Sequence, residues 1–264
     1  MLQDKVIIVT GATSGIGWGI AQEVYKQGAK LVLHGRDLEE AKVAAEKLGE
    51  RAFPVAGDLT EEAALYALVP AAMDAFGRLD GLVNNAAVMT RDDIEHTTRD
   101  LHDEIMAINC RAPLFLSQAA IKQFLKQDTG GTIVNIGSIN AYCGQNNTLT
   151  YSMAKGALQT MTRNLGDALG PQRIRVNQLN VGWTDTENED RIQKLQGMGE
   201  NWRDHIPPVF APSGQLLQPD NIAAHAVFWL SDLSAPVNGQ VYEVEQYPVI
   251  GRNKINVAER ADNA

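Results

Sequence analysis

Two kinds of apolar pattern alternate along the chain. Residues 6–10 form a short apolar run without polar alternation, which is typical of a strand buried on both faces of a parallel sheet. Residues 16–27 instead carry apolar side chains at helical spacing and end at Gly28, which predicts an amphipathic helix. The same two patterns repeat as strands at 30–34, 52–56 and 81–84 and as helices at 38–48 and 61–76.

The second half of the chain continues this order. A long helical stretch covers residues 99–126. Further strands follow at 131–137, 173–179 and 240–245, and further helices at 150–169 and 219–230. Because each connection between parallel strands crosses over the sheet, we predict an α/β fold, a doubly wound parallel sheet of about seven strands with helices on both faces. At 264 residues we expect a single domain over residues 1–264.

Two segments do not follow the alternation. Residues 183–218 mix glycines, prolines and charges with Trp183 and Trp202, and long irregular inserts of this kind are usually lids over a binding site. Residues 248–264 form a polar C-terminal tail, which is either disordered or docked on a neighbouring subunit.

Charge and cysteine content narrow the function classes. With 32 acidic against 23 basic residues the formal net charge is −9, which argues against a nucleic-acid groove. The N-terminal apolar run is too short to span a bilayer and carries no cleavage pattern. Cys110 and Cys143 lack metal-ligand spacing, so we expect no metal site and two reduced packing residues in a cytoplasmic protein. The composition favours a soluble enzyme.

The first strand gives way to the first helix through a glycine-rich turn, Thr10-Gly11-Ala12-Thr13-Ser14-Gly15-Ile16-Gly17. Its three glycines let the backbone turn tightly and approach a pyrophosphate, which the amides and the dipole of the helix N-terminus then face. The G-x-x-x-G-x-G spacing differs from the G-x-G-x-x-G of typical dinucleotide dehydrogenases. The turn still predicts a site for the phosphates of a dinucleotide.

The end of the second strand bears on the choice between NAD and NADP. An acidic residue there would accept hydrogen bonds from the ribose hydroxyls and select NAD. Here Gly35 takes that place and Arg36 follows, a cation able to grip a 2′-phosphate, so we expect NADP to be preferred, with NAD as the alternative. Asp37 close by works against this preference, and Arg36 can also be interpreted as a solvated charge at a helix start.

Asp58 follows the third strand in Gly57-Asp58-Leu59-Thr60. Its carboxylate could accept a hydrogen bond from the adenine amino group. Alternatively, Asp58 or Thr60 caps the helix that begins near Glu61, and the two roles are compatible.

Ser138, Tyr151 and Lys155 carry the chemistry that the sequence predicts. Ser138 sits just past the strand at 131–137, at the carboxyl edge where open α/β sheets bind ligands. Tyr151 and Lys155 are one helical turn apart and share a face. A free phenol has a pKa of about 10, and a nearby ammonium favours the phenolate, so we expect Lys155 to lower the pKa of Tyr151. Tyr151 then exchanges a proton with a substrate oxygen to which Ser138 hydrogen-bonds.

Together with the glycine turn, these three residues resemble the short-chain dehydrogenase/reductase family, and the resemblance runs from Lys5 to about Glu245. It implies a Rossmann fold and hydride transfer between a nicotinamide and a secondary alcohol or its ketone. It also implies a homotetramer assembled through the helices at 105–126 and 152–169. The family's catalytic asparagine, which holds a water in a proton relay, matches Asn109. Taken alone, Asn109 would be a helix-interior residue that satisfies backbone groups.

The resemblance also assigns the cofactor contacts. Lys155 is expected to hold the nicotinamide ribose, and Thr186 to touch the nicotinamide amide or the phosphates. The full set of expected contacts is Gly11, Thr13, Ser14, Gly15, Ile16, Gly17, Arg36, Asp58, Leu59, Asn85, Tyr151, Lys155, Thr184 and Thr186.

Three places depart from the family pattern. Ala87 ends the Asn84-Asn85-Ala86-Ala87 segment where the family has glycine, and Val181 replaces a proline after the sixth strand. Gln246 and Tyr247 stand where the family has two glycines after the last strand. We therefore expect a rebuilt edge of the active site, or a rebuilt subunit contact, at these last two residues.

Polar side chains gather where a substrate would bind. After Ser138 the chain carries Asn140, Tyr142, Gln145, Asn146 and Asn147, and the lid adds Trp202, Arg203 and His205. We expect substrate contacts at Asn140, Gln145, Trp183 and Trp202, and His205 on the lid surface. Amides and an aromatic face suit a small hydroxylated substrate such as a sugar, sugar acid or polyol, unless the amides only cap surface turns.

Two other functions stay open. A 3-oxoacyl-thioester reductase should show a basic patch for its phosphopantetheine carrier, and the lid sequence has no clear one. A dinucleotide-sensing regulator would bind the cofactor without chemistry, whereas the intact set Asn109, Ser138, Tyr151 and Lys155 favours an enzyme. Neither nucleic acid nor a membrane is expected as a partner.

Overall fold

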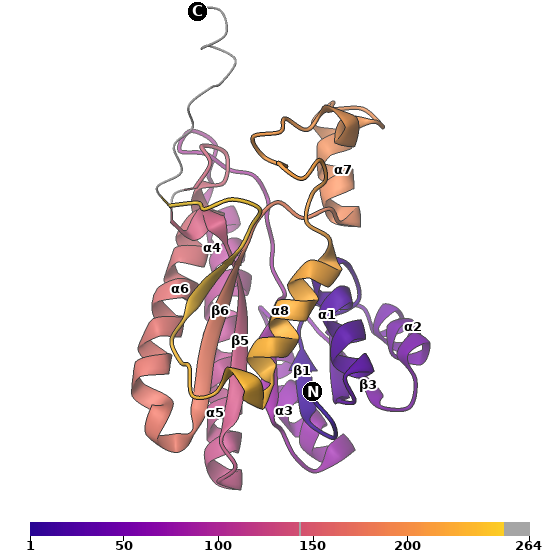
Figure 1. The fold of residues 1–264 in the computed structure, drawn as a ribbon, viewed down its shortest axis with the longest axis vertical. Coiled ribbons are helices and arrows are strands. Elements are labelled where there is room, and N and C mark those ends of the chain that lie inside the picture. The colour runs from indigo at the N-terminus through magenta and orange to yellow at the C-terminus, as the bar shows by residue number, and fades with distance from the viewer. Residues whose placement is uncertain (143, 251–264) are drawn as a thin grey trace, which may run out of the picture.

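The computed structural model describes residues 1–142 and 144–250. Cys143 and the expected C-terminal tail from residue 251 on lie outside the described residues. The described part of the chain forms one seven-stranded parallel sheet in the order β3-β2-β1-β4-β5-β6-β7 (Figure 1). The strands are β1 (Val6–Val9), β2 (Lys30–Gly35), β3 (Ala52–Ala56), β4 (Gly81–Asn84), β5 (Gly131–Ser138), β6 (Ile174–Val181) and β7 (Val241–Val244). This confirms the predicted fold class.

Helices cover both faces of the sheet. They are α1 (Gly15–Lys26), α2 (Leu38–Leu48), α3 (Glu62–Phe76), α4 (Arg99–Met106), α5 (Ala112–Gln127), α6 (Leu149–Leu169), α7 (Glu187–Leu195) and α8 (Pro219–Leu230). Alternate residues of a strand point to opposite faces, so Ile7 and Val9 of β1 join the core beneath α1, α2 and α8, whereas Val6 and Ile8 join the core beneath α3 and α5. Figure 1 shows α1 and α8 next to each other on the first face.

Strand order reverses between β1 and β4, because the chain leaves β3 at one edge and re-enters the sheet on the other side of β1. Loops that follow β1 and β4 therefore diverge, and ligands of such sheets bind at this point, outside the carboxyl ends of the strands. The fold thus brings the glycine turn after β1 and the segment after β4 to one site.

Three strands run further than the apolar runs predict. Gly35 still belongs to β2 and pairs with Ala56, and Ser138 is the last residue of β5 rather than the first residue past it. The third case is Val181, which ends β6 between Ser138 and Val244. Valine keeps the backbone N–H and the free φ angle that proline lacks, so Val181 can pair between two strands where a proline would not donate.

A row of amide side chains crosses the buried centre of the sheet. Asn84, Asn135 and Gln178 are register partners on β4, β5 and β6, and the Nδ2 of Asn84 donates to Oδ1 of Asn135 at 2.8 Å. The hydroxyl of Thr162 on α6 accepts from Nδ2 of Asn135 at 2.8 Å and lies 2.9 Å from Oε1 of Gln178. Nε2 of Gln178 then donates to Asn180 at 2.7 Å. A single hydroxyl therefore joins the amides of two strands to α6, the helix that carries Tyr151.

Replacing Thr162 with valine should lower the free energy of unfolding by about 2 to 4 kcal/mol, because the change leaves one donor and one acceptor buried without partners. Thr160→Val, two residues earlier on the exposed side of the same helix, is the matched control and should cost less than about 0.5 kcal/mol. Urea unfolding of both variants, followed by circular dichroism at one protein concentration, checks this. Equal effects of the two substitutions would contradict it.

Candidate active site

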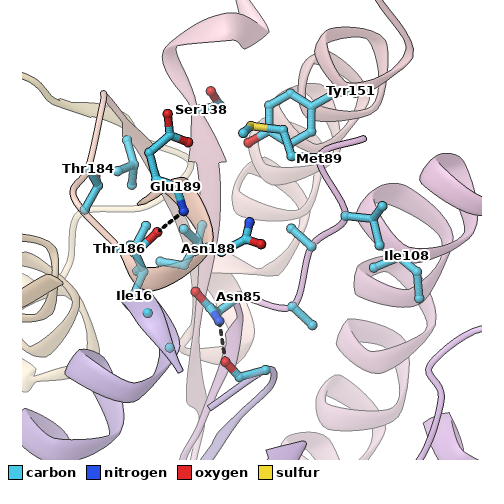
Figure 2. A pocket seen from close by; sticks show the side chains of 18 of the residues that line it. Ile16, Asn85, Met89, Ile108, Ser138, Tyr151, Thr184, Thr186, Asn188 and Glu189 are labelled. Carbon is cyan, nitrogen blue, oxygen red and sulfur yellow. Dashed lines mark hydrogen bonds between the residues drawn. The ribbon is translucent and has the colours of Figure 1, made fainter. Parts of the chain in front are cut away.

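A cavity of about 1250 Å³ opens at the carboxyl edge of the sheet (Figure 2). Every residue expected to contact the cofactor lines it, from the glycine turn to Thr184 and Thr186. Ser138, Tyr151 and Lys155 line the same cavity, as do Asn140, Gln145 and Trp183 of the expected substrate contacts. The structure thus brings into one space residues that lie up to 175 positions apart in the sequence.

The glycine turn is shaped by how closely it packs against Asn85. A Cβ on Gly17 would lie 2.0 Å from the carbonyl oxygen of Gly11 and 2.3 Å from Nδ2 of Asn85, so no larger residue fits there. That Nδ2 donates to the carbonyl oxygens of Thr10 at 2.8 Å and Gly11 at 3.0 Å. Ser14, the N-cap residue of α1, makes no side-chain capping bond. The first amides of α1 are left for an anion, so the turn fits a pyrophosphate.

His34 is a residue of this end that the sequence reasoning missed. It is buried, its Nε2 donates to the carbonyl oxygen of Gly57 at 3.0 Å, and its Nδ1 accepts from the amide of Gly11 at 3.3 Å. Burial lowers the pKa of His34, which keeps the ring neutral and able to donate on one side and accept on the other. One imidazole therefore joins the turns after β1 and β3.

Asp37 and Asp58 have specific local roles at the expected ribose end. Oδ1 of Asp37 caps α2 by accepting from the amides of Glu39 and Glu40 at 2.8 and 2.9 Å, while Arg36 is exposed and lines the cavity. Oδ1 of Asp58 accepts from the amide and the hydroxyl of Thr60, both at 2.8 Å. Helix α3 begins only at Glu62, and neither residue caps it, so that alternative is wrong. Hydrogen bonds to Thr60 and the charge of Arg36 lower the pKa of Asp58.

The catalytic residues expected from the sequence meet at the end of β5. Tyr151 on α6 lies near Ser138, whose hydroxyl acts to lower the pKa of the phenol, and its ring is almost fully buried. Lys155, one turn further along the helix, donates from Nζ to the carbonyl oxygen of Ile136 at 2.7 Å, and this Nζ lies 5.6 Å from the centre of the Tyr151 ring. The backbone of β5 therefore fixes both ends of the group.

Asn109 lies behind this group rather than in the cavity wall. It sits in a π turn, Ala107–Arg111, that joins α4 to α5 inside the helical stretch predicted at 99–126. Its side chain is fully buried, accepting from the amide of Val88 at 2.8 Å and donating to the carbonyl oxygen of Val88 at 2.7 Å. The amide thus satisfies backbone groups, and its neighbour Ile108 faces the cavity (Figure 2). A water relay at Asn109 stays a prediction.

Asp92 is a second residue that the sequence reasoning missed. Its buried carboxylate accepts from the amide of Thr150 at 3.1 and 3.2 Å, from the hydroxyl of Thr150, and from the hydroxyl of Thr97 at 2.6 Å. Thr150 directly precedes Tyr151, so Asp92 caps the start of the catalytic helix. Donor and acceptor lie 58 positions apart, so no local pattern in the sequence could reveal this cap.

Residues 183–218, the lid segment, are more regular than predicted, because they contain α7 and a 3₁₀ turn at Trp202–His205. A bridge between Thr184 and Leu217 closes the base of the segment. Trp202 is only 1% exposed, stacks on Trp183 with ring centres 6.0 Å apart and donates to Asp190 at 2.9 Å. Trp202 therefore does not line the cavity and supports Trp183 from behind, which corrects its expected substrate contact.

The departure at the end of β7 rebuilds the far side of the lid segment. Oε1 of Gln246 accepts from the amide and the hydroxyl of Ser213 at 3.1 and 2.6 Å, and its Nε2 donates to the carbonyl oxygen of Gln215 at 2.8 Å. Tyr247 lines the cavity. Glycines at these two positions have no side chain, so they could neither hydrogen-bond to the lid segment nor line the cavity.

Comparison with known proteins places this geometry in a family. Residues 11–246 match the family model described as enoyl-(acyl carrier protein) reductase. The chain is 32% identical to 2-dehydro-3-deoxy-D-gluconate 5-dehydrogenase of Dickeya dadantii, over 92% of this chain and 95% of that protein. It is 31% identical to galactitol 2-dehydrogenase of Agrobacterium fabrum, over 92% and 97%. The crystal structure of 3-ketoacyl-(acyl-carrier-protein) reductase from Brucella melitensis complexed with NADH superposes with a TM-score of 0.82 at 32% identity, covering 92% and 98%.

The chain belongs to the short-chain dehydrogenase/reductase family. As a member of it, the protein is an NAD(P)-dependent oxidoreductase that acts on a CH–OH group or the corresponding ketone. Among the described residues, no helix is long and apolar enough to cross a membrane. No group of three His, Cys, Asp or Glu side chains able to hold a metal occurs in that part of the chain either.

Burial decides the protonation of the catalytic pair in this oxidoreductase. It raises the pKa of Tyr151 to about 12, against the hydrogen bond with Ser138, and lowers the pKa of Lys155 to about 8. The expected lowering of the Tyr151 pKa by Lys155 is therefore wrong for the protein on its own, because loss of solvation disfavours the phenolate and the ammonium alike. Tyr151 is a neutral O–H donor at pH 7, suited to protonate a carbonyl oxygen, while alcohol oxidation needs its phenolate.

Titration of the protein without cofactor should show Tyr151 still protonated after an ordinary tyrosine has ionised, since its pKa lies above the usual value. The measurement is phenolate absorbance at 295 nm from pH 7 to 10 for the wild type and for Tyr151→Phe. The two curves should coincide over this range. Phenolate absorbance below pH 9 that Tyr151→Phe removes would contradict the raised pKa.

Proposed function

We propose that this oxidoreductase transfers hydride between NADP and a secondary alcohol of a small hydroxylated substrate, a sugar, sugar acid or polyol. The observation that carries the proposal is the lining of the cavity beyond Ser138 and Tyr151. Asn140, Gln145 and Asn147 line one side, and α7 adds Asn188, Glu189 and Gln193 from the lid segment. Amide and carboxylate groups on two sides can donate to and accept from several hydroxyls at once.

Apolar side chains of the cavity complement this polar set. Trp183 and Phe210 line it from the lid segment with their rings edge to face, 6.2 Å apart, and Met89 lies beside the Tyr151 ring (Figure 2). Flat apolar faces of this kind pack against the C–H groups of a sugar or polyol. The names of the two relatives, a dehydro-deoxy-gluconate dehydrogenase and a galactitol dehydrogenase, support the same substrate class.

Roles follow from the positions of the side chains. Tyr151 exchanges the proton on the substrate oxygen, and Ser138, which lines the same cavity, holds that oxygen. Lys155 anchors beside Tyr151 and reaches the nicotinamide ribose, while the glycine turn carries the pyrophosphate. The bound dinucleotide supplies or accepts the hydride.

The rival functions gain less support. The solved relative named as a 3-ketoacyl-(acyl-carrier-protein) reductase makes a thioester substrate worth weighing. However, two cations of the lid segment are already bound by carboxylates: Arg203 by Asp185 and Asp190, and Lys194 by Asp190 and Glu200. Such paired charges attract a phosphopantetheine carrier weakly. The assembled group of Ser138, Tyr151 and Lys155 argues against a silent regulator.

The proposal includes a cytoplasmic homotetramer built on α5 and α6. Three large apolar side chains on these helices are exposed: Leu114 at 42%, Leu125 at 50% and Met153 at 53%. Burial of such side chains against a second copy is favourable.

Preference for NADP rests on Arg36, whose guanidinium lines the cavity while Asp37 is occupied in capping α2. Arg36→Gln should raise the KM for NADP about tenfold or more, the loss expected for a charge-assisted hydrogen bond to phosphate, and leave the KM for NAD within about twofold. Lys42→Gln is the control, because it removes a positive charge from the exposed side of the nearby helix α2. Initial rates with both cofactors measure this, and equal changes for NADP and NAD would contradict it.

The function itself is tested by absorbance at 340 nm with NADP or NAD and a panel of sugars, aldonates, alditols and simple secondary alcohols. We expect turnover of a hydroxylated compound and a loss of at least about a thousandfold in Tyr151→Phe, which keeps the ring but has no proton to exchange. Dinucleotide binding by that variant, followed by fluorescence, should persist. Turnover confined to 3-oxoacyl thioesters would overturn the proposal, as would dinucleotide binding with no turnover at all.

A further inference from the structure

Arg91 is a cation in the cavity wall that the proposed chemistry has not used. It lies on the segment after β4, two residues past Met89, which packs against the Tyr151 cluster. Nη1 donates to Oδ1 of Asn147 at 3.2 Å and to Oε1 of Gln145 at 3.5 Å. Nε is buried and has no hydrogen-bond partner among the described residues.

Like Arg175 and Arg191, Arg91 bonds neutral groups, and unlike Arg175 it lines the cavity. Arg78, Arg173 and Arg203 each lie within 4.0 Å of a carboxylate oxygen. In the described part of the chain Arg91 makes no such ion pair, and its partners are neutral amides. A partly buried guanidinium that keeps its charge without a counter-ion is unfavourable, so an anionic ligand in the cavity would stabilise it.

The position of Arg91 relative to Tyr151 is fixed through the backbone. The next residue, Asp92, donates its amide to the carbonyl oxygen of Asn147 at 3.1 Å and accepts from the amide of Leu149 at 3.2 Å. Its carboxylate caps α6 one residue before Tyr151. Arg91 is thus tied to the start of the helix that carries Tyr151, as a binding group must be if it is to place one end of a substrate relative to the reacting carbon.

The two amides leave one nitrogen of the guanidinium for a ligand. Gln145 and Asn147 accept from Nη1, and Nε is buried, so Nη2 remains. A charge-assisted hydrogen bond from a guanidinium nitrogen to a carboxylate oxygen is stronger than one between neutral groups. The lid segment contributes Glu189 to the cavity lining, and its Oε1 accepts from Trp183 at 2.8 Å and from Gln193 at 2.7 Å. A carboxylate there repels an anion and accepts hydrogen bonds from hydroxyls. The acid end of a substrate is therefore favoured near Arg91 and the hydroxylated end near Glu189.

We infer that Arg91 binds a carboxylate group of the substrate, so that this oxidoreductase acts on a sugar acid rather than on a neutral sugar or polyol. The inference rests on the proposed function and narrows its substrate class. Arg91 holds the acid end, Gln145 and Asn147 keep the guanidinium in place, and the hydroxylated end extends toward the lid segment.

Pairs of substrates that differ at one carbon test this directly. D-gluconate and D-glucitol, or D-galactonate and galactitol, carry the same hydroxyls and differ by a carboxylate in place of a hydroxymethyl group. The wild type should show a kcat/KM at least about tenfold higher for the acid of the preferred pair. Arg91→Gln should lower kcat/KM for that acid about 10- to 100-fold, mainly through KM, and change that for the alditol by less than about threefold.

Two further variants sharpen the result. Arg99→Gln makes the same change of charge at an exposed position of α4 and should leave kcat/KM unchanged for both substrates. Arg91→Lys keeps the charge without the planar guanidinium that Gln145 and Asn147 hold in place, and should recover only part of the preference for the acid. A wild type that prefers alditols, or an Arg91→Gln enzyme that loses both members of a pair equally, would overturn the inference and leave the proposed function standing.

A binding measurement distinguishes failure of the inference about Arg91 from failure of the proposed oxidoreductase function. Calorimetric titration of the preferred aldonate into Tyr151→Phe with NADP should show binding that Arg91→Gln, introduced into that variant, weakens at least about tenfold. If the wild type turns over no hydroxylated compound, the proposed function fails. Arg91-dependent aldonate binding would then still support a carboxylate site, and its absence would overturn it.

Discussion

The approach of Asn85 to the glycine turn is the constraint on which the rest of the site depends. One amide nitrogen bonds the carbonyl oxygens of Thr10 and Gly11 across the space where any larger residue at position 17 would place its Cβ. This contact sets where α1 begins and hence where its free amides point. It also fixes the start of the segment that leaves β4.

That segment joins the two ends of the cavity by a series of anchors. Asn109 holds the backbone of Val88, Met89 packs beside Tyr151, and Asp92 caps α6. The start of the catalytic helix is therefore tied, within a few residues, to the turn that fits the pyrophosphate. Hydride transfer needs the nicotinamide and the substrate oxygen in register, and this shared segment is the part of the protein that relates them.

The sequence predicted the features whose signal lies within one helix, strand or turn. Apolar runs and helical spacing located the strands and helices, and the pattern of Ser138, Tyr151 and Lys155 identified the residues that the fold brings together, because each signal lies within one element. His34 and Asp92 were missed because their partners lie 23 and 58 residues away. Trp202 was misplaced since a tryptophan in an irregular insert reveals nothing about which way it faces. The protonation of Tyr151 was misjudged because burial, which sequence does not give, raises its pKa.

The bridge between Thr184 and Leu217 gives the lid segment a base whose two ends are adjacent. A loop that departs from and returns to nearly the same point can change in length or sequence at little cost in chain entropy and without moving the strands it leaves. The sheet, the glycine turn and the catalytic helix can therefore be inherited unchanged while this single excursion varies. In evolutionary terms each lineage can revise the part of the substrate site that the lid segment supplies, while the residues that carry the reaction stay unchanged.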